Sequence, residues 1–328
     1  MVNIRVLRGP DVRQLLPMAE CIELMQRTMI ALSEGRVVLP LRSLLAMPKE
    51  IGMMGIMPGY LGEPECFGVK LVSLMPRNKP PQFSSHLGVV LLFECEHGQP
   101  IALFDAAAIT AIRTAAASAV ATRLLAREEA ANLALLGAGE QAQSHLEAML
   151  AVRKMRRVRV WARDPAKASA FAAAEGARHG IRIETAQTVQ EAVSGADVIC
   201  TLTKARDPIL LGEWIEPGTH LNIVGSSVAA KAEIDTPAVA KSRFFVDCRN
   251  STIHEGGEYL RALRADAITP DHILAEIGEV ANASKPGRRS PGEVTLYKSL
   301  GVAPQDLAAA HFVLQQARAR GVGQSVEF

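Results

Sequence analysis

The feature that most constrains this sequence is an apolar run that ends in a glycine-rich turn. Residues 132–136 are apolar after the first position, and Gly137-Ala138-Gly139-Glu140-Gln141-Ala142 follows at once. This spacing fits G-x-G-x-x-A between a strand and a helix. Gly137 permits a tight turn, Gly139 lets the backbone approach a ligand, and Ala142 allows close packing of helix on strand. The N–H groups of the helix N-terminus favour phosphate, so we expect a dinucleotide site here.

The region around this turn alternates between expected strands and expected helices. Such alternation is typical of a parallel, doubly wound sheet of the Rossmann type. The strands are expected at 132–136, 158–161, 181–184, 197–202, 220–224 and 244–247, and the helices at 141–152, 166–178 and 189–193.

The first hundred residues follow another pattern, with one expected helix and several short apolar runs broken by prolines. The pattern indicates an α+β domain with a largely antiparallel sheet, and the length of 328 residues also favours two domains. A late helix over 305–318 follows the last dinucleotide-type strand, so we expect it to return to the first domain. The other expected elements are a helix at 11–33, strands at 37–47, 53–57, 66–75, 88–94 and 101–105, a helix at 108–126 and a polar surface loop at 282–292.

Composition excludes several classes of function. A formal net charge of +2 gives no overall field for nucleic acid or an anionic membrane, and 4% aromatic residues offer few stacking platforms. The five cysteines are widely spaced without a zinc-type cluster, which predicts reduced thiols and no metal. Residues 1–16 lack the apolar core of a signal peptide, and 106–125 is a poor membrane span. We expect a soluble, cytoplasmic enzyme.

The end of the second expected strand bears on the choice of cofactor. NAD sites place an acidic residue about 20 residues after the first glycine, where it binds the ribose hydroxyl. Here Ala162 and Arg163 come first, and a guanidinium suits a 2′-phosphate. The sequence therefore favours NADP(H). If Asp164 reaches the ribose instead, NAD(H) is the cofactor.

Three isolated cations lie in apolar surroundings of the first domain: Arg42, Lys70 and Arg113. An unpaired charge there is costly to bury, and none of the three has Asp or Glu as a sequence neighbour. One interpretation is a shared pocket for a small carboxylate, in which arginine gives bidentate recognition and lysine donates a proton near neutral pH. The alternative is that each charge extends to solvent from an edge of the fold.

These motifs, in this order, resemble the ornithine cyclodeaminase/mu-crystallin family, and the mu-crystallin branch is the most similar. The resemblance runs from Val38 to about Gly321. Its motifs are Leu41-Arg42, Gly55-Ile56-Met57-Pro58, Lys70-Leu71-Val72, Ser85-His86, Ile112-Arg113-Thr114-Ala115-Ala116, the glycine turn, Glu213-Trp214, Val224-Gly225-Ser226-Ser227 and Lys298-Ser299-Leu300-Gly301.

The resemblance implies a discontinuous substrate-binding and dimerisation domain over 1–112 and 303–328, a Rossmann domain over 113–302, and a homodimer. It implies that Arg42, Lys70 and Arg113 bind the substrate carboxylate beside the nicotinamide. The cofactor-binding residues that it implies, with the glycine turn, are His86, Arg113, Thr114, Gly137, Ala138, Gly139, Gln141, Ala142, Ala162, Arg163, Thr201, Leu202, Thr203, Val224, Gly225 and Leu300.

One departure from the family pattern concerns the chemistry. Ornithine cyclodeaminases resemble Gly-Gly-Asp or Gly-Ala-Asp where this chain has Gly225-Ser226-Ser227, and a serine hydroxyl cannot replace a carboxylate as a base unaided. Ring closure of ornithine is therefore disfavoured, and Ser227 is expected to orient the substrate. The resemblance then implies reduction of a small cyclic imine 2-carboxylate, a ketimine reductase activity. The alternatives are an amino-acid dehydrogenase, an ornithine cyclodeaminase, and a non-catalytic protein that binds NADPH or a small ligand.

Overall fold

In a computed structural model of this chain, residues 3–75, 77–78 and 86–327 are described, with the side chain of His86 excluded. They form two compact units. The first unit is Met1–Arg113 with Val302–Phe328, and the second unit is Thr114–Gly301. The boundaries predicted from the sequence, after residues 112 and 302, lie within one residue of this division.

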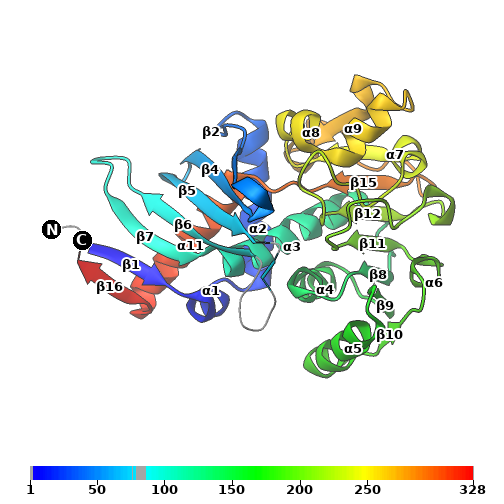
Figure 1. The fold of residues 1–328 in the computed structure, drawn as a ribbon, viewed down its shortest axis with the longest axis horizontal. Coiled ribbons are helices and arrows are strands. Elements are labelled where there is room, and N and C mark those ends of the chain that lie inside the picture. The colour runs from blue at the N-terminus through cyan, green and yellow to red at the C-terminus, as the bar shows by residue number, and fades with distance from the viewer. Residues whose placement is uncertain (1–2, 76, 79–85, 328) are drawn as a thin grey trace. The chain divides into compact units, whose positions relative to one another are not determined.

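The first unit is built on a mixed sheet with strand order β16-β1-β7-β6-β5-β4-β2, and β3 also pairs with β4. Neighbouring strands are antiparallel except β1 and β7, which are parallel. Figure 1 shows the first and last strands, β1 and β16, side by side. The strands are β1 (Asn3–Leu7), β2 (Val37–Val38), β3 (Ser43–Ala46), β4 (Met53–Gly62), β5 (Glu65–Leu74), β6 (His86–Phe93), β7 (Pro100–Asp105) and β16 (Gln324–Glu327).

Three helices accompany this sheet: α1 (Gly9–Leu15), α2 (Met18–Ser33) and α11 (Ala303–Arg320). Helix α11 packs on β4, β5, β6 and α2, so the last long helix of the chain joins the first unit. The single helix expected at 11–33 is wrong, because the chain leaves the helix at Leu16 and Pro17 begins the next one from an extended conformation.

The strands near β4 also differ from expectation. The run 37–47 is two short strands, β2 and β3, with residues 39–42 between them. Pro58 was expected to end a strand, but it lies inside β4 opposite Val69 of β5. A proline can occupy a strand where its missing N–H is not needed by the ladder.

The second unit is built on an eight-stranded sheet in the order β10-β9-β8-β11-β12-β15-β13-β14, with all pairs parallel. From β8 the chain moves outward through β9 and β10, and then returns to β11 on the other side of β8. The switch point of this Rossmann-type fold is therefore between β8 and β11, where such sheets bind ligands at the carboxyl ends of their strands. The strands are β8 (Asn132–Leu136), β9 (Arg157–Trp161), β10 (Ile183–Thr185), β11 (Val198–Thr201), β12 (His220–Ile223), β13 (Arg243–Val246), β14 (Ile273–Glu276) and β15 (Thr295–Lys298).

Helices connect these parallel strands. The central strands β8, β11, β12 and β15 are buried along nearly their whole length, as expected where a sheet is covered on both faces. The second unit also contains most of α3, a helix of small residues whose first turns belong to the first unit. The helices are α3 (Ala106–Leu125), α4 (Glu140–Val152), α5 (Pro165–His179), α6 (Val189–Val193), α7 (Thr236–Lys241), α8 (Arg249–Glu255), α9 (Gly257–Arg264) and α10 (Ile277–Ala281).

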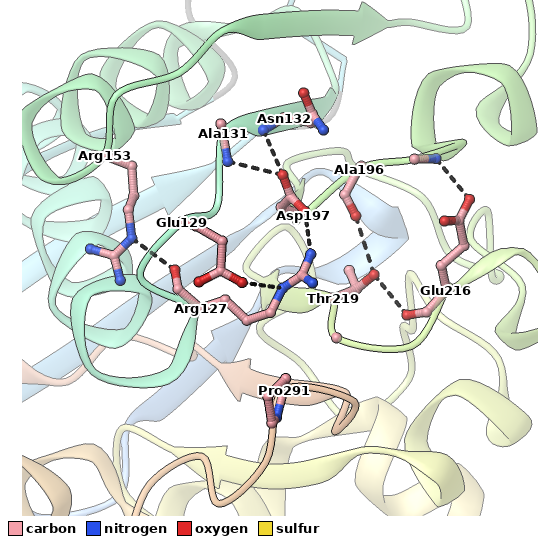
Figure 2. A network of polar contacts seen from close by, with 12 residues as sticks. Arg127, Glu129, Ala131, Asn132, Arg153, Ala196, Asp197, Glu216, Thr219 and Pro291 are labelled. Atoms are coloured by element: carbon pink, nitrogen blue, oxygen red, sulfur yellow. Dashed lines mark hydrogen bonds and ion pairs between the residues drawn. The ribbon is translucent and has the colours of Figure 1, made fainter.

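A polar network holds the amino ends of the central strands, as Figure 2 shows. Asp197 accepts hydrogen bonds from the backbone N–H groups of Ala131 and Asn132, both at 2.9 Å, and pairs with Arg127. Arg153 donates to the carbonyl of Arg127 at 3.2 Å and to carbonyls at the end of α3. This edge of the sheet is thus closed by structural contacts, and the opposite edge carries the glycine turn.

No helix in the described part of the chain is long and apolar enough to cross a membrane.

Candidate active site

The glycine turn adopts a conformation that excludes other residues at its first position. Gly137 has φ +131°, and a Cβ there would lie 2.7 Å from the carbonyl oxygen of Leu202. Its N–H donates to the carbonyl of Trp161 at 2.8 Å, and Leu202 N–H donates to Leu136 at 2.8 Å. The turn therefore draws the ends of β8, β9 and β11 together at the switch point.

The space beside this turn fits a phosphate-containing ligand. Gly139 is exposed and precedes α4, and a Cβ there would meet nothing within 4 Å. Ala142 is fully buried under the helix. Two buried polar atoms, Oε1 of Gln141 and Oγ1 of Thr114, have no hydrogen-bond partner among the described residues. A free helix N-terminus, an open cradle and unsatisfied polar atoms match what a dinucleotide requires.

The other residues expected at this edge lie at or just after the ends of three strands, β11, β12 and β15. Thr201 and Val224 are buried, whereas Leu202, Thr203 and Gly225 are half-buried. Leu300, after β15, is also buried, and its N–H donates to Asp247 Oδ2 at 2.7 Å. These positions belong to the carboxyl edge of one sheet, because β11, β12 and β15 are parallel neighbours.

The end of β9 offers an exposed guanidinium. Ala162 is half-buried, and Arg163 and Asp164 are exposed. The Asp164 carboxylate accepts the N–H of Ala166 at 3.1 Å and caps α5. That contact uses one oxygen of Asp164, and Arg163 is the exposed cation beside it at the same strand end.

In the first unit, Lys70 and Arg113 meet on one carboxylate that sequence reasoning missed. Lys70 Nζ lies 3.1 Å from Asp306 Oδ1, and Arg113 Nε lies 2.9 Å from the same oxygen. All three side chains are buried, with exposed fractions of 4% or less. Arg113 Nη1 also donates to Gln305 Oε1 at 2.8 Å. Lys70 comes from β5, Arg113 from α3, and Asp306 from the first turn of α11.

This cluster is not fully satisfied by its own members. Asp306 Oδ2 is buried without a hydrogen-bond donor among the described residues. Two cations share one carboxylate, which leaves an excess positive charge in a buried place. An anionic ligand would lower the energy of such an arrangement.

Burial and neighbouring charges set the protonation of this cluster. Burial lowers the pKa of Lys70 to about 8, against the attraction of Asp306, and the charges of Arg113 and Arg42 lower it as well. Although burial opposes its ionisation, Arg113 and Lys70 hold the pKa of Asp306 below its usual value. With a pKa near 8, Lys70 is about nine-tenths protonated at pH 7 and can still release its proton.

Two further expected residues belong to the first unit. Arg42 is half-buried in the segment between β2 and β3, and its charge acts on Lys70. Arg42 therefore lies within electrostatic range of Lys70, whereas only Lys70 and Arg113 meet on Asp306. His86 begins β6 opposite Leu74, and its side chain lies outside the described residues.

Serines 226 and 227 have different surroundings. Ser226 is buried, and its hydroxyl bonds Glu258 and accepts from Lys298 Nζ at 2.7 Å. Lys298 and Glu258 form an ion pair of 2.8 Å, both with no exposed surface. Ser227, the next residue after Ser226, is half-buried and presents a hydroxyl where a cyclodeaminase pattern has aspartate.

One group in the described residues has the spacing of a metal site: Glu94, Glu96 and His97, in the turn between β6 and β7. The Glu94 carboxylate already accepts the backbone N–H groups of Glu96, His97 and Gln99 at 2.7–3.2 Å. The close spacing of these three residues is therefore explained by the hydrogen bonds with which Glu94 stabilises an exposed turn.

The fold and these residues define a class. The second unit has a parallel sheet with a glycine turn at its switch point, and the first unit has buried cations around one carboxylate. These features are typical of two-domain α/β proteins that bind a dinucleotide. The chain belongs to the ornithine cyclodeaminase/mu-crystallin family, which it matches over residues 3–321.

Three relatives illustrate the similarity. The ketimine reductase mu-crystallin of Mus musculus is 38% identical over 280 residues, 85% of each chain. The Thermococcus litoralis Δ1-pyrroline-2-carboxylate reductase, solved with NADH and L-proline, superposes with a TM-score of 0.95 at 36% identity, over 98% of this chain and 100% of that one. An archaeal alanine dehydrogenase dimer with bound NAD superposes with a TM-score of 0.93 at 30% identity, over 100% of both chains.

Proposed function

We propose that this chain reduces a small cyclic imine 2-carboxylate, of the pyrroline or piperideine type, with a nicotinamide dinucleotide. The observation that carries the proposal is the cluster in which Lys70 and Arg113 share Asp306 Oδ1 and Arg42 lies near Lys70. The named activities of the mouse and Thermococcus relatives support the same reaction.

The arginines have the chemistry to bind the substrate carboxylate. Arg113 is fixed through Nε and Nη1, so its remaining N–H groups have a set direction. A planar guanidinium held in this way recognises a carboxylate through directed hydrogen bonds. Arg42 supplies a second positive charge near Lys70. The two together orient the carbon beside the carboxylate.

Lys70 has the chemistry to provide the proton. The imine nitrogen must gain a proton as its carbon gains a hydride, and the hydride is what the nicotinamide supplies when bound. A lysine with a pKa of about 8 is protonated at neutral pH and acidic enough to donate. Asp306 keeps the ammonium beside the substrate nitrogen, and Ser227 adds a hydrogen bond to the substrate.

The glycine turn and the strand ends of the second unit have the features to hold the cofactor. Gly137, Gly139 and the N-terminus of α4 would receive the pyrophosphate, and Gln141 and Thr114 offer buried polar atoms that await partners. The expected set Ala138, Ala142, Ala162, Thr201, Leu202, Thr203, Val224, Gly225 and Leu300 lies along the same edge of that unit.

We favour NADP(H) over NAD(H), on the contacts at the end of β9. Asp164 caps α5, and Arg163 is exposed beside it. Lys167, in the first turn of α5, adds a positive charge near the same strand end. Positive charges at this position suit a 2′-phosphate better than a free hydroxyl.

Cyclodeamination is disfavoured by the surroundings of Ser227. The carboxylate that follows it, Glu233, has four hydrogen-bond donors on its two oxygens. A carboxylate bonded in this way has no free lone pair directed at a substrate. The proposal therefore excludes ring closure of a diamino acid.

We also propose that the chain forms a homodimer through the first unit. Val38, Leu44 and Leu45 are 49–59% exposed on β2 and β3, which both pair with β4. An exposed apolar surface of this kind marks an interface. The archaeal alanine dehydrogenase relative is described as a dimer. Light scattering on a Leu45→Glu variant should show a monomer, and a wild-type monomer would contradict the proposal.

A substrate panel tests the reaction. NADPH and NADH oxidation are followed with pyrroline-2-carboxylate, piperideine-2-carboxylate, and pyruvate with ammonia. We expect the cyclic imines to be reduced faster by at least about tenfold in kcat/KM, a difference that directed binding can supply. Faster turnover of pyruvate with ammonia would indicate an amino-acid dehydrogenase. Tight NADPH binding without turnover of any imine would indicate a binding protein.

A further inference from the structure

The second unit contains a buried carboxylate, Glu233, that sequence reasoning did not single out. It has no exposed surface and lies in the segment between β12 and α7. Its Oε1 accepts the N–H and the hydroxyl of Thr203, both at 2.7 Å. Its Oε2 accepts the hydroxyl of Thr201 at 2.7 Å and the N–H of Gly225 at 2.6 Å.

These donors come from the ends of two neighbouring strands. Thr201 ends β11 and Thr203 follows it, while Gly225 follows β12. The approach is close, since a Cβ on Gly225 would lie 2.2 Å from the Thr203 carbonyl oxygen and 2.5 Å from Glu233 Oε1. The carboxylate therefore ties both strand ends into a single geometry.

The backbone of Glu233 is fixed as well. Its N–H donates to Glu258 Oε1 at 3.0 Å, and its carbonyl accepts from Ile209 at 2.8 Å. Glu258 in turn pairs with Lys298 at 2.8 Å and bonds Ser226, the residue after Gly225. The position of the carboxylate is thus set by a second buried layer beneath it.

Glu233 has no ion-pair partner within 4.0 Å among the described residues, so its charge is stabilised by four neutral hydrogen-bond donors and by the more distant charge of Lys298. Burying a carboxylate with no directly paired cation is costly, and apolar packing would stabilise the fold better. What a carboxylate adds is four directed acceptor positions on two oxygens. This feature points to control of geometry rather than to stability.

We propose that Glu233 is a positioning residue that holds Thr201, Thr203 and Gly225 in the arrangement required by the nicotinamide half of the cofactor. The inference rests on the proposed function, because it uses the cofactor edge assigned there. Glu233 does not contact the cofactor in this account, and it acts through the residues that do.

The test compares the whole cofactor with its adenosine half. Binding of NADPH and of 2′-phospho-ADP-ribose is measured by titration calorimetry for wild type and Glu233→Gln, with NADH and ADP-ribose in parallel. The amide has one acceptor oxygen fewer and directs an NH2 group at donors. We expect NADPH to bind at least about tenfold more weakly, the scale of lost charge-assisted hydrogen bonds, and 2′-phospho-ADP-ribose to change less than about twofold.

A matched control acts at the other end of the same sheet. Asp197 also accepts two backbone N–H groups, and it does so at the amino ends of the strands. Asp197→Asn should weaken both ligands equally or neither. Glu233→Asp, which keeps the charge but withdraws both acceptor oxygens by one methylene, leaves every cofactor-edge residue in place and should weaken NADPH about threefold. That variant carries the test if Glu233→Gln does not fold.

The outcomes separate the two proposals. Equal weakening of NADPH and 2′-phospho-ADP-ribose in Glu233→Gln, or no weakening of either, would overturn the positioning role while the cofactor assignment remained. A wild-type protein that binds neither nucleotide would overturn the proposed function, and this inference with it.

Discussion

Asp306 in the first unit and Glu233 in the second are both fully buried carboxylates, but their partners differ. Asp306 receives two cations on one oxygen and leaves the other oxygen without a donor among the described residues. Glu233 receives four neutral donors, two on each oxygen. The cluster around Asp306 has a net positive charge that an anionic ligand can neutralise. The acceptor positions of Glu233 are all occupied by donors of the protein itself.

The comparison shows how one chain separates two tasks. A cluster with excess charge and unused hydrogen-bonding atoms is suited to bind and protonate a substrate. A saturated carboxylate is suited to hold backbone and side chains in place. Substitutions in the Asp306 cluster should therefore change the reaction rate without unfolding the protein. Substitutions at Glu233 or Glu258 should change the free energy of unfolding or the binding of the cofactor.

The largest effect is expected for Lys70→Met, which removes the proton donor. We expect kcat for the cyclic imine to fall about 10³-fold, the scale of general acid catalysis, with NADPH affinity unchanged. Steady-state kinetics and NADPH fluorescence titration check both. Lys241→Met is the matched control, because Lys241 donates only to carbonyl groups in the described structure of the second unit. Retention of the full rate by Lys70→Met would remove Lys70 from the mechanism.

The next effect concerns the buried pair beneath the second unit's edge. Glu258→Gln leaves the Lys298 ammonium buried without its carboxylate, so the free energy of unfolding should fall by about 3 kcal/mol. Urea denaturation followed by circular dichroism measures this change. The double variant Glu258→Leu with Lys298→Met should recover most of the loss, because no charge is left buried. A loss below about 1 kcal/mol in the single variant would show that the pair is not isolated from water.

A smaller effect is expected in the pH dependence of the first unit. Activity requires protonated Lys70, so kcat/KM should fall as pH rises through about 8. Asp306 raises the pKa of Lys70, so Asp306→Asn should move this limb to lower pH by about one unit. The sign is fixed, because removing a negative neighbour favours the neutral amine. Asp235→Asn, which changes a structural carboxylate, is the control and should leave the pH profile of kcat/KM unchanged. An unchanged profile in Asp306→Asn as well would show that a group other than Lys70 controls the decrease at high pH.

The smallest effect is expected at the exposed end of β9. Arg163→Ser should weaken NADPH about fivefold and leave NADH unchanged, since exposed charge pairs contribute little. Arg157→Ser, at the start of the same strand, is the control, because its guanidinium bonds carbonyls at the amino end of the sheet. Equal effects on both cofactors would remove the proposed preference for NADP(H).

Local sequence pattern predicted the second unit well and the first unit less well. The alternation of strands and helices and the turn at Gly137 are local signals, and β8 and α6 have the predicted bounds. Strands β1 and β16 escaped prediction, because they pair across 317 or more residues and their partners carry no local mark. The break at Pro17 was missed because the apolar spacing continues through it.

The site shows the same limit. Arg42, Lys70 and Arg113 could be identified from the sequence, because each is a charged residue inside an apolar run. Asp306 was missed because 193 residues separate it from Arg113 and 236 from Lys70. The sequence did contain one indication of Asp306, because it is a charged residue in the first turn of a helix, on a face that is otherwise apolar and expected to be buried. The pairing itself depends on tertiary structure.

The place of Asp306 in the chain has a consequence for synthesis. The polypeptide carries Lys70 and Arg113 out of the ribosome long before α11 emerges, and the whole second unit is made in between. Until then the two cations lack their counter-ion, and β4, β5 and β6 lack the helix that covers them. During synthesis, the cluster of Lys70, Arg113 and Asp306 therefore cannot form before α11 has left the ribosome.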